Sequence, residues 1–447
     1  MARRLEAGED FVITSAVGGH VRFGAGWTVA PELDLDLDIS CLMLDANGAI
    51  KDAIFYGNML DTSGAVRHLG DDVTGEGCAK TEDEQISVSL NDLPTDVAAL
   101  VFMLNASTSS DLSRTEDIFF RVRDAKNEPL VETALPKECR VKETHSVLSL
   151  ALYRTGEADQ WDGWCMRFLL EPYSEPSWGE LIPEAKKALL FAFPGMNIDP
   201  SEFVAIMRKS EDRPLDDIAN FRLLKNGQEP THVTSVRIDV GWTVLASAGV
   251  EKVDMDTNIL LTDDKGAVVG EVNFNNKEEK GIKLLGDERS VDATSDDKKP
   301  AKFPVHEQVV VTLTEVDPKV KNIVIFVTNY SGTGFTQLES VRCRFVETAT
   351  GQDLSVFSVD CRQGEASGKK TVMVGKVYRD NICSAFHDWK FAQTQDSELS
   401  LEAVQKMQAQ RGLPAFDEDA GLSIPDWEQK AEIQWRIRGL GQFCYGE

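Results

Sequence analysis

The sequence has little that would place the chain in a membrane or on nucleic acid. No apolar run approaches the roughly 18 residues that a membrane-spanning helix needs, and residues 1–6 lack the apolar core of a signal peptide. Basic residues are scarce, since 47 Lys and Arg stand against 74 Asp and Glu, a formal net charge of −27. Such a surface repels phosphate backbones. We therefore expect a cytoplasmic protein that neither binds nucleic acid nor inserts into a membrane.

Recognisable catalytic motifs are also lacking. The 6 histidines have no metal-ligand spacing, and the 8 cysteines form no Cys-x-x-Cys pair. Phosphate-binding loops, the Gly-x-Ser-x-Gly elbow and His-Glu-x-x-His are missing. These absences predict a protein that is not an enzyme and whose thiols are reduced. Because acidic residues are plentiful, an acid-dependent hydrolase stays open as an alternative.

What the sequence does contain is an internal repeat. Residues 36–50 and 254–268 align without a gap, and each has an Asp-x-Asp pair, an apolar run and an Asp-x-x-Gly turn. The other shared motifs are Gly-Trp-Thr-Val at 26–29 and 241–244, Leu-Gly-Asp at 69–71 and 285–287, Glu-Gln at 84–85 and 307–308, Tyr-Arg at 153–154 and 378–379, and the pair Trp164 and Trp389. Ordered matches of this kind indicate a duplicated domain.

Each copy has the pattern of a β-sandwich. Apolar residues alternate with polar ones from Leu33 to Met43, and turn residues follow, which is typical of a strand with one buried face. Many short strands between turns favour two packed sheets. Further strands are predicted at 97–104, 118–122, 146–153, 322–328, 341–345 and 371–378. The fold class is mainly β, with sandwiches at 1–172 and 229–395.

Two stretches lie outside the repeat, and both are predicted to be helical. The linker, 173–228, contains an apolar segment from Trp178 to Phe193 and a second helix from Asp199 to Met207, with Pro200 at an early helical position. The C-terminal extension, 396–447, is predicted to form helices at 400–411 and 426–438. Its apolar residues either dock a partner or pack back on the second sandwich.

Acidic residues line one side of the predicted strand in the first copy. In an extended chain, Asp34, Asp36 and Asp38 share a face at spacings of ~7 Å. Carboxylates in a row repel one another, and a bound hard cation such as calcium relieves that repulsion. Calcium takes six to eight oxygen ligands, and the acidic, glycine-jointed loop at 70–84 can supply more of them. A solvated acidic face is the alternative.

These motifs resemble the TerD family of tellurium-resistance and stress proteins. The resemblance rests on the Asp-x-Asp strand, Phe-Tyr-Gly-Asn at 55–58 and Gly-Asp-Asp-Val-Thr-Gly-Glu-Gly at 70–77. It implies a calcium-binding β-sandwich without a known catalytic constellation. Carried over by position, the implied calcium ligands of the first copy are Asp36, Asp38, Asp71, Asp72, Glu76, Asp83 and Glu84.

The second copy departs from that pattern. Lys252 stands where the first copy has Asp34, and His306 replaces Asp83. The glycine-rich segment at 75–77 has no counterpart. The candidate calcium ligands that remain are Asp254, Asp256, Asp287 and Glu307. The alternative is a degenerate copy that is kept for packing or for partner binding.

The sequence therefore predicts a calcium-binding, non-enzymatic stress-response or signalling module that acts through protein partners. The linker and the extension at 396–447 are the expected contact regions. One alternative is a structural scaffold component of a large assembly, for example a cytoskeletal one, with fixed or vestigial calcium sites. The other is the acid-dependent hydrolase.

Overall fold

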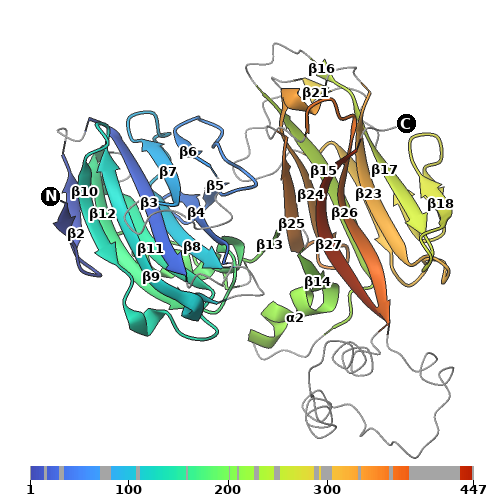
Figure 1. Ribbon diagram of the computed structural model, residues 1–447, viewed down its shortest axis with the longest axis horizontal. Coiled ribbons are helices and arrows are strands. Elements are labelled where there is room, and N and C mark those ends of the chain that lie inside the picture. The colour runs from blue at the N-terminus through green and yellow to red at the C-terminus, as the bar shows by residue number, and fades with distance from the viewer. Residues whose placement is uncertain are drawn as a thin grey trace, which may run out of the picture.

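The computed structural model contains two β-sandwiches that follow one another along the chain (Figure 1). The residues it describes are 2–14, 18–29, 35–70, 82–106, 111–157, 160–200, 202–208, 211–225, 231–245, 252–285, 291–292, 305–330, 334–361, 366–381 and 433–444. The mainly β fold and the strands predicted from the sequence are confirmed. No described helix is long and apolar enough to cross a membrane.

The first sandwich is built from two six-stranded sheets. One sheet has the order β1 (Arg3–Arg4), β10 (Pro129–Ala134), β9 (Thr115–Asp124), β3 (His20–Val29), β7 (Glu84–Ser89) and β6 (Val66–His68). The other has the order β2 (Asp10–Ile13), β12 (Gln160–Tyr173), β11 (Ser146–Glu157), β8 (Ala99–Ala106), β4 (Leu37–Leu44) and β5 (Ile50–Ile54). Short 3-10 helices lie at Leu112–Arg114 and Lys137–Cys139.

The second sandwich repeats this arrangement. Its seven-stranded sheet has the order β13 (Ala205–Met207), β25 (Asp353–Asp360), β24 (Leu338–Glu347), β15 (Ser235–Val244), β22 (Glu307–Thr312), β20 (Ile282–Leu284) and β19 (Glu278–Glu279). Its six-stranded sheet has the order β14 (Asp212–Pro214), β27 (Ile433–Cys444), β26 (Thr371–Asn381), β23 (Asn322–Asn329), β17 (Met255–Thr262) and β18 (Val268–Val272). A two-stranded pair, β16 (Lys252–Val253) and β21 (Val291–Asp292), and a 3-10 helix at Phe335–Gln337 complete it.

The prediction of a helical linker is wrong, because two of its segments are edge strands of the second sandwich. β13 pairs in parallel with β25, as β1 pairs in parallel with β10 in the first copy. β14 pairs antiparallel with β27, as β2 pairs with β12. The predicted helix at 199–207 thus contains β13, whose apolar residues are all buried and gain backbone partners at the sheet edge. Edge pairing outweighs the helix signal from Pro200.

Helix does form in the linker, but in short pieces. The predicted helix at 178–193 is a 3-10 turn, η4 (Trp178–Glu180), followed by α1 (Ile182–Lys187). Beyond α1 the backbone continues in i→i+3 turns, such as Leu189 N–H to the Lys186 carbonyl at 3.1 Å, and Pro194 then stops any helix. A helix not predicted from the sequence, α2 (Leu215–Lys225), follows β14.

The predicted helix at 426–438 is also wrong where the structure describes it. Residues from Ile433 onward form β27, which pairs with β26 along its length. Ile433, Trp435 and Ile437 alternate with polar residues, and this period of two favours a strand. β27 holds the place of β12, so Trp435 lies opposite Arg379 as Trp164 lies opposite Arg154. Trp435 is therefore the counterpart of Trp164; Trp389 and the predicted helix at 400–411 lie outside the described residues.

Strand β4 is buried on both sides, and this explains how the linker packs. Leu37, Ile39, Cys41 and Met43 face the sandwich core, whereas Leu42 and Leu44 lie in a second apolar cluster on the outer face of the sheet. That cluster also contains Trp178, Leu181, Ile182, Ala185 and Leu189 of the linker, and Val356 of β25. The linker thus covers one face of the first sandwich and joins it to the second. The described cysteines are unbridged.

Candidate functional site

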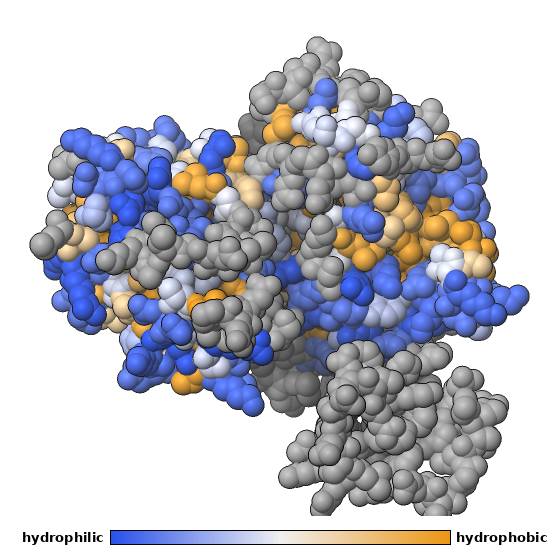
Figure 2. Space-filling view, viewed as in Figure 1, coloured by the Kyte–Doolittle hydropathy of each residue, from blue (hydrophilic) through white to orange (hydrophobic). Residues whose placement is uncertain are grey.

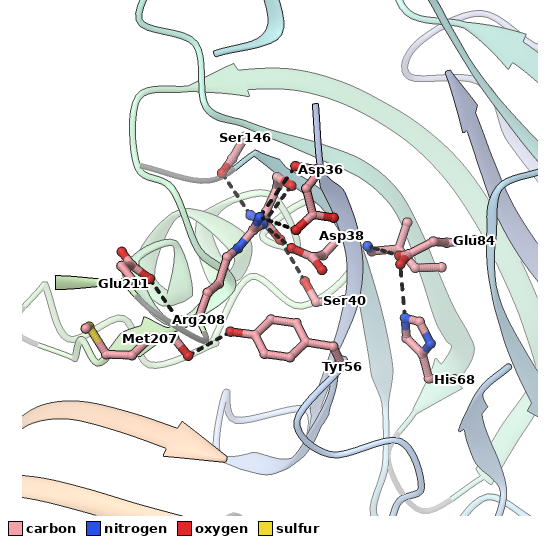
Figure 3. Close-up of polar contacts among 12 residues, drawn as sticks. Asp36, Asp38, Ser40, Tyr56, His68, Glu84, Ser146, Met207, Arg208 and Glu211 are labelled. Carbon is pink, nitrogen blue, oxygen red and sulfur yellow. Dashed lines mark hydrogen bonds and ion pairs between the residues drawn. The ribbon is translucent and has the colours of Figure 1, made fainter. Parts of the chain in front are cut away.

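Two of the predicted calcium ligands meet a positive charge from the same chain. The guanidinium of Arg208 forms ion pairs with Asp36, at 3.3 Å between Nη1 and Oδ2, and with Asp38 through Nη2 (Figure 3). It also donates to two backbone carbonyl oxygens, those of Asp36 at 3.4 Å and Asn105 at 3.2 Å. Asp36 lies just before β4 and Asp38 lies on it, so the extended chain presents both carboxylates to the same point.

Contacts from the first sandwich and from the linker itself hold Arg208 in this position. The hydroxyl of Tyr56 donates to the carbonyl oxygen of Met207 at 2.9 Å, and the Arg208 N–H donates to Glu211 Oε2 at 2.8 Å. Burial by itself lowers the pKa of a guanidinium, but the surrounding Asp38, Tyr56 and Asp36 outweigh it and raise the pKa of Arg208. The side chain stays charged and is only 15% exposed.

The oxygen atoms around Arg208 have the chemistry of a hard-cation site. Two carboxylates and two carbonyls point at one positive group, and such oxygen donors are those that calcium takes in proteins. The donor set therefore fits calcium, although a guanidinium lies within it. Among the residues that the structure describes, no three His, Cys, Asp or Glu side chains are grouped closely enough to hold a metal. Asp71, Asp72 and Glu76 lie outside the described residues.

Asp83 and Glu84, which were also predicted as ligands, hold backbone groups. Glu84 is buried on β7, and its Oε2 accepts the Ile39 N–H of the opposite sheet at 2.7 Å and lies 3.6 Å from His68 Nε2. Figure 3 shows Glu84 and His68 together, to one side of the group around Arg208. Asp83 Oδ2 accepts the Trp27 N–H at 2.8 Å. Both carboxylates thus connect elements of the sandwich.

The second copy keeps these connections with partly different side chains. Glu307 is buried, and its Oε2 accepts the Thr257 N–H at 2.5 Å, as Glu84 accepts from Ile39. His306 Nδ1 accepts the Trp242 N–H at 3.2 Å, which is the counterpart of the hydrogen bond from the Trp27 N–H to Asp83. The described residues Asp254 and Asp256 flank the start of β17, and Asp287 lies outside the described part of the chain.

The His306 contact predicts that acid destabilises the second sandwich. Burial lowers the pKa of His306 to about 4, below its ordinary value near 6.5. Its contribution to stability is therefore present above pH 6.5 and is lost as the pH falls toward 4, by about 2 kcal/mol at pH 5. His306→Gln keeps an acceptor but does not titrate. In urea unfolding, the wild type should lose more stability than this variant between pH 7.5 and pH 5; equal losses would contradict the assignment.

Sequence reasoning missed Arg208 altogether. It lies about 170 residues along the chain from its carboxylate partners, and no local pattern links them. The one available signal is charge. Because Asp36 and Asp38 need a compensating cation, a basic residue of the chain itself was a candidate beside a metal ion.

Comparisons with known proteins agree with the duplicated fold. The TerD domain model matches residues 1–164 and 219–399. Among curated proteins, tellurium resistance protein TerZ of Serratia marcescens is 32% identical over 28% of this chain and 69% of its own length. Stress response protein SCP2 of Bacillus subtilis is 31% identical over 28% of this chain and 73% of its own length.

Two further similarities concern a longer protein and a solved structure. Flagellar radial spoke protein 1 of Chlamydomonas reinhardtii is 22% identical over 75% of this chain, which spans about half (48%) of that protein. A solved homologue of telluride resistance protein from Streptomyces coelicolor is 13% identical, with a TM-score of 0.30, and covers 35% of this chain and 92% of its own. Since the family model matches both sandwiches, the chain belongs to the TerD domain family.

Proposed function

We propose that the chain is a calcium-binding, non-enzymatic stress-response module that acts through protein partners. The relatives named for tellurium resistance and stress response support the stress-response role. The observation that carries the calcium proposal is the set of oxygens from Asp36, Asp38 and Asn105, which is directed at one cationic group. The excess of acidic residues, which gives the chain a net charge of −27, favours the binding of a cation by this group of oxygens.

Asp36 and Asp38 are the described residues that would hold calcium. Bound there, the ion supplies two positive charges to neighbouring carboxylates that otherwise repel each other. Asp38 is 5% exposed and the Asp36 side chain 37% exposed, so the pair reaches from the buried strand toward solvent. Asp71, Asp72 and Glu76 complete the proposed ligand set, on the family resemblance alone.

Exposed apolar residues on the second sandwich support the proposal of protein partners. Val268 and Val269 of β18 are 60% and 44% exposed, and Phe274 and Tyr330 next to this edge are 43% and 54% exposed. Figure 2 shows hydrophobic surface on this side of the second sandwich, over the strands β17, β23 and β18. An edge strand with exposed valines can accept a further strand or an apolar surface.

A second candidate function is that of a structural component in a large assembly. It is favoured by the match to flagellar radial spoke protein 1, which extends over 75% of this chain and so over both sandwiches. In this reading the apolar edge of the second sandwich makes the important contacts and calcium is dispensable. Complex formation that is lost in Val268→Asp but kept in Asp36→Asn/Asp38→Asn would favour it.

Calcium addition is expected to stabilise the wild-type protein after chelator treatment. A ligand that binds only the folded state at 100 times its dissociation constant adds about 2.7 kcal/mol to the free energy of unfolding. Asp36→Asn/Asp38→Asn should abolish the shift in melting temperature. Asp353→Asn, which removes a half-exposed carboxylate of the second copy that pairs with Arg344 and lies outside both predicted ligand sets, should keep the shift and serves as the control. Magnesium should not reproduce the shift. A melting temperature that calcium leaves unchanged in the wild type would contradict calcium binding by the native chain.

A further inference from the structure

Arg208 occupies the centre of the oxygen set at which calcium binding is proposed. Both carboxylates and both carbonyls reach the same guanidinium, which leaves each of these oxygens engaged with a positive group. Little room remains beside the guanidinium. A cavity of about 20 Å³ lies beside it, lined by Asp38, Ser40, Asn105 and Arg208 among others. That volume suits one water molecule, so a hydrated divalent cation does not fit while the guanidinium stays in place.

The segment that carries Arg208 belongs to the second sandwich. Arg208 directly follows β13, which pairs with β25 through Ala205, Ile206 and Met207. On the other side, Tyr56 of the first sandwich holds the carbonyl of Met207. The position of the guanidinium therefore depends on how the second sandwich is docked against the first.

We propose that Arg208 is a built-in cation that competes with calcium for the site of the first sandwich and so couples calcium binding to the docking of the two sandwiches. The proposal rests on the proposed calcium function and adds its regulation. One group of oxygens cannot bind the guanidinium and a divalent ion together, so the ion binds the fraction of molecules in which Arg208 has left. The apparent dissociation constant is raised in inverse proportion to that fraction. A partner that loosens the docking of the second sandwich therefore tightens calcium binding. By linkage, calcium tightens the binding of that partner by the same factor.

Arg208→Met tests the competition directly, since it removes the charge and retains an unbranched side chain. Calorimetric titration with calcium chloride of the full-length chain should give a dissociation constant at least on the order of 10-fold lower in the variant than in the wild type, because a site open in a tenth of the molecules binds tenfold more weakly. Arg208→Lys, which keeps a positive charge, should stay close to the wild type. Adding Asp38→Asn to Arg208→Met should remove the gain.

Arg344→Met is a matched control in the second sandwich. Arg344 also pairs with a buried carboxylate, Asp239 at 2.5 Å, and its side chain is 18% exposed against 15% for Arg208. It should leave the calcium affinity unchanged. Tyr56→Phe provides a milder test that removes one hydrogen bond to the linker and no charge. It should also raise the calcium affinity, and it keeps the proposal testable if Arg208→Met folds poorly.

The outcomes separate this inference from the proposed function. Equal calcium affinities in the wild type, Arg208→Met and Tyr56→Phe overturn the competition and leave calcium binding intact. Binding by Arg208→Met with none by the wild type supports the competition and removes the calcium function from the native chain. Absence of binding in all of these variants overturns both.

Discussion

Replacing Arg213 by methionine is expected to destabilise the protein by about 3–5 kcal/mol, because it leaves a buried carboxylate without its cation. Glu180 lies in η4 with its side chain fully buried, and Arg213 Nη2 donates to its Oε1 at 2.9 Å. The Ser177 hydroxyl supplies the other hydrogen bond at 2.8 Å. Arg213 lies on β14 of the second sandwich, so the pair connects this sandwich to the linker that covers the first. Urea unfolding at pH 7.5 measures the loss.

The pH dependence and a double variant identify the cause of this loss. Burial raises the pKa of Glu180 even though Arg213 opposes the shift, and removing Arg213 raises it further. A carboxyl whose pKa is raised in the folded state binds more protons there, so the loss of stability in the variant, relative to the wild type at the same pH, should shrink as the pH falls from 7.5 toward 5. Glu180→Leu combined with Arg213→Met should restore most of the stability. A loss relative to the wild type that is as large at pH 5 as at pH 7.5 would show that lost packing, and not the unpaired charge of Glu180, is responsible.

Three arginines on the side of the second sandwich contact the first sandwich or its linker. Arg208 follows β13, Arg213 lies on β14 and Arg342 lies on β24. Arg208 meets Asp36 and Asp38, Arg213 meets Glu180, and Arg342 Nη2 donates to Asn58 Oδ1 at 2.6 Å. Each places a cation on an acidic or polar acceptor of the other side. In a chain with a net charge of −27, these contacts offset part of the repulsion between the sandwiches. Their docking is therefore electrostatic as well as apolar.

The repeat and its strands were predictable because both are local signals. Alternating residues in β4, β23 and β26 and the matched motifs identify two sandwiches without any tertiary information. The same alternation was present from Ile433 to Arg438 and marks β27, but a long separation from β26 hid its partner. In the sheet, β27 lies between β14 and β26, the position that β12 has between β2 and β11 in the first copy.

The linker and the surroundings of the predicted calcium ligands were harder to predict, since both depend on distant residues. An apolar segment such as 203–207 fits a helix or an edge strand equally well until the edge of β25 is known. Acidic residues likewise do not reveal their roles. Glu84 and Glu307 share a sequence motif, and each accepts a backbone N–H from the opposite sheet, whereas Asp36 and Asp38 meet a guanidinium. Only the packing of the two sheets and the path of the linker separate these cases.

The linker should also contribute to the core of the first sandwich, and Trp178→Ala tests this. Trp178 is 6% exposed, its ring centroid lies 5.4 Å from that of Phe55, and it belongs to the apolar cluster on the outer face of β4. Truncating a buried aromatic side chain removes its apolar contacts and leaves a cavity, which costs about 3–5 kcal/mol. The expected result is a lower free energy of unfolding for the first sandwich, measured in urea at pH 7.5.

Leu190→Ala on the same segment provides the matched control. Leu190 is 37% exposed and lies in the turns beyond α1, so its truncation should change the stability by only about 0.5 kcal/mol. A loss in Trp178→Ala no larger than that of Leu190→Ala would mean that the linker rests on the sheet without stabilising it. The expected difference instead makes residues 178–196 a part of the first sandwich in energetic terms. β13, which Arg208 follows, and β14, which contains Arg213, then connect the cover of the first sandwich to the sheets of the second.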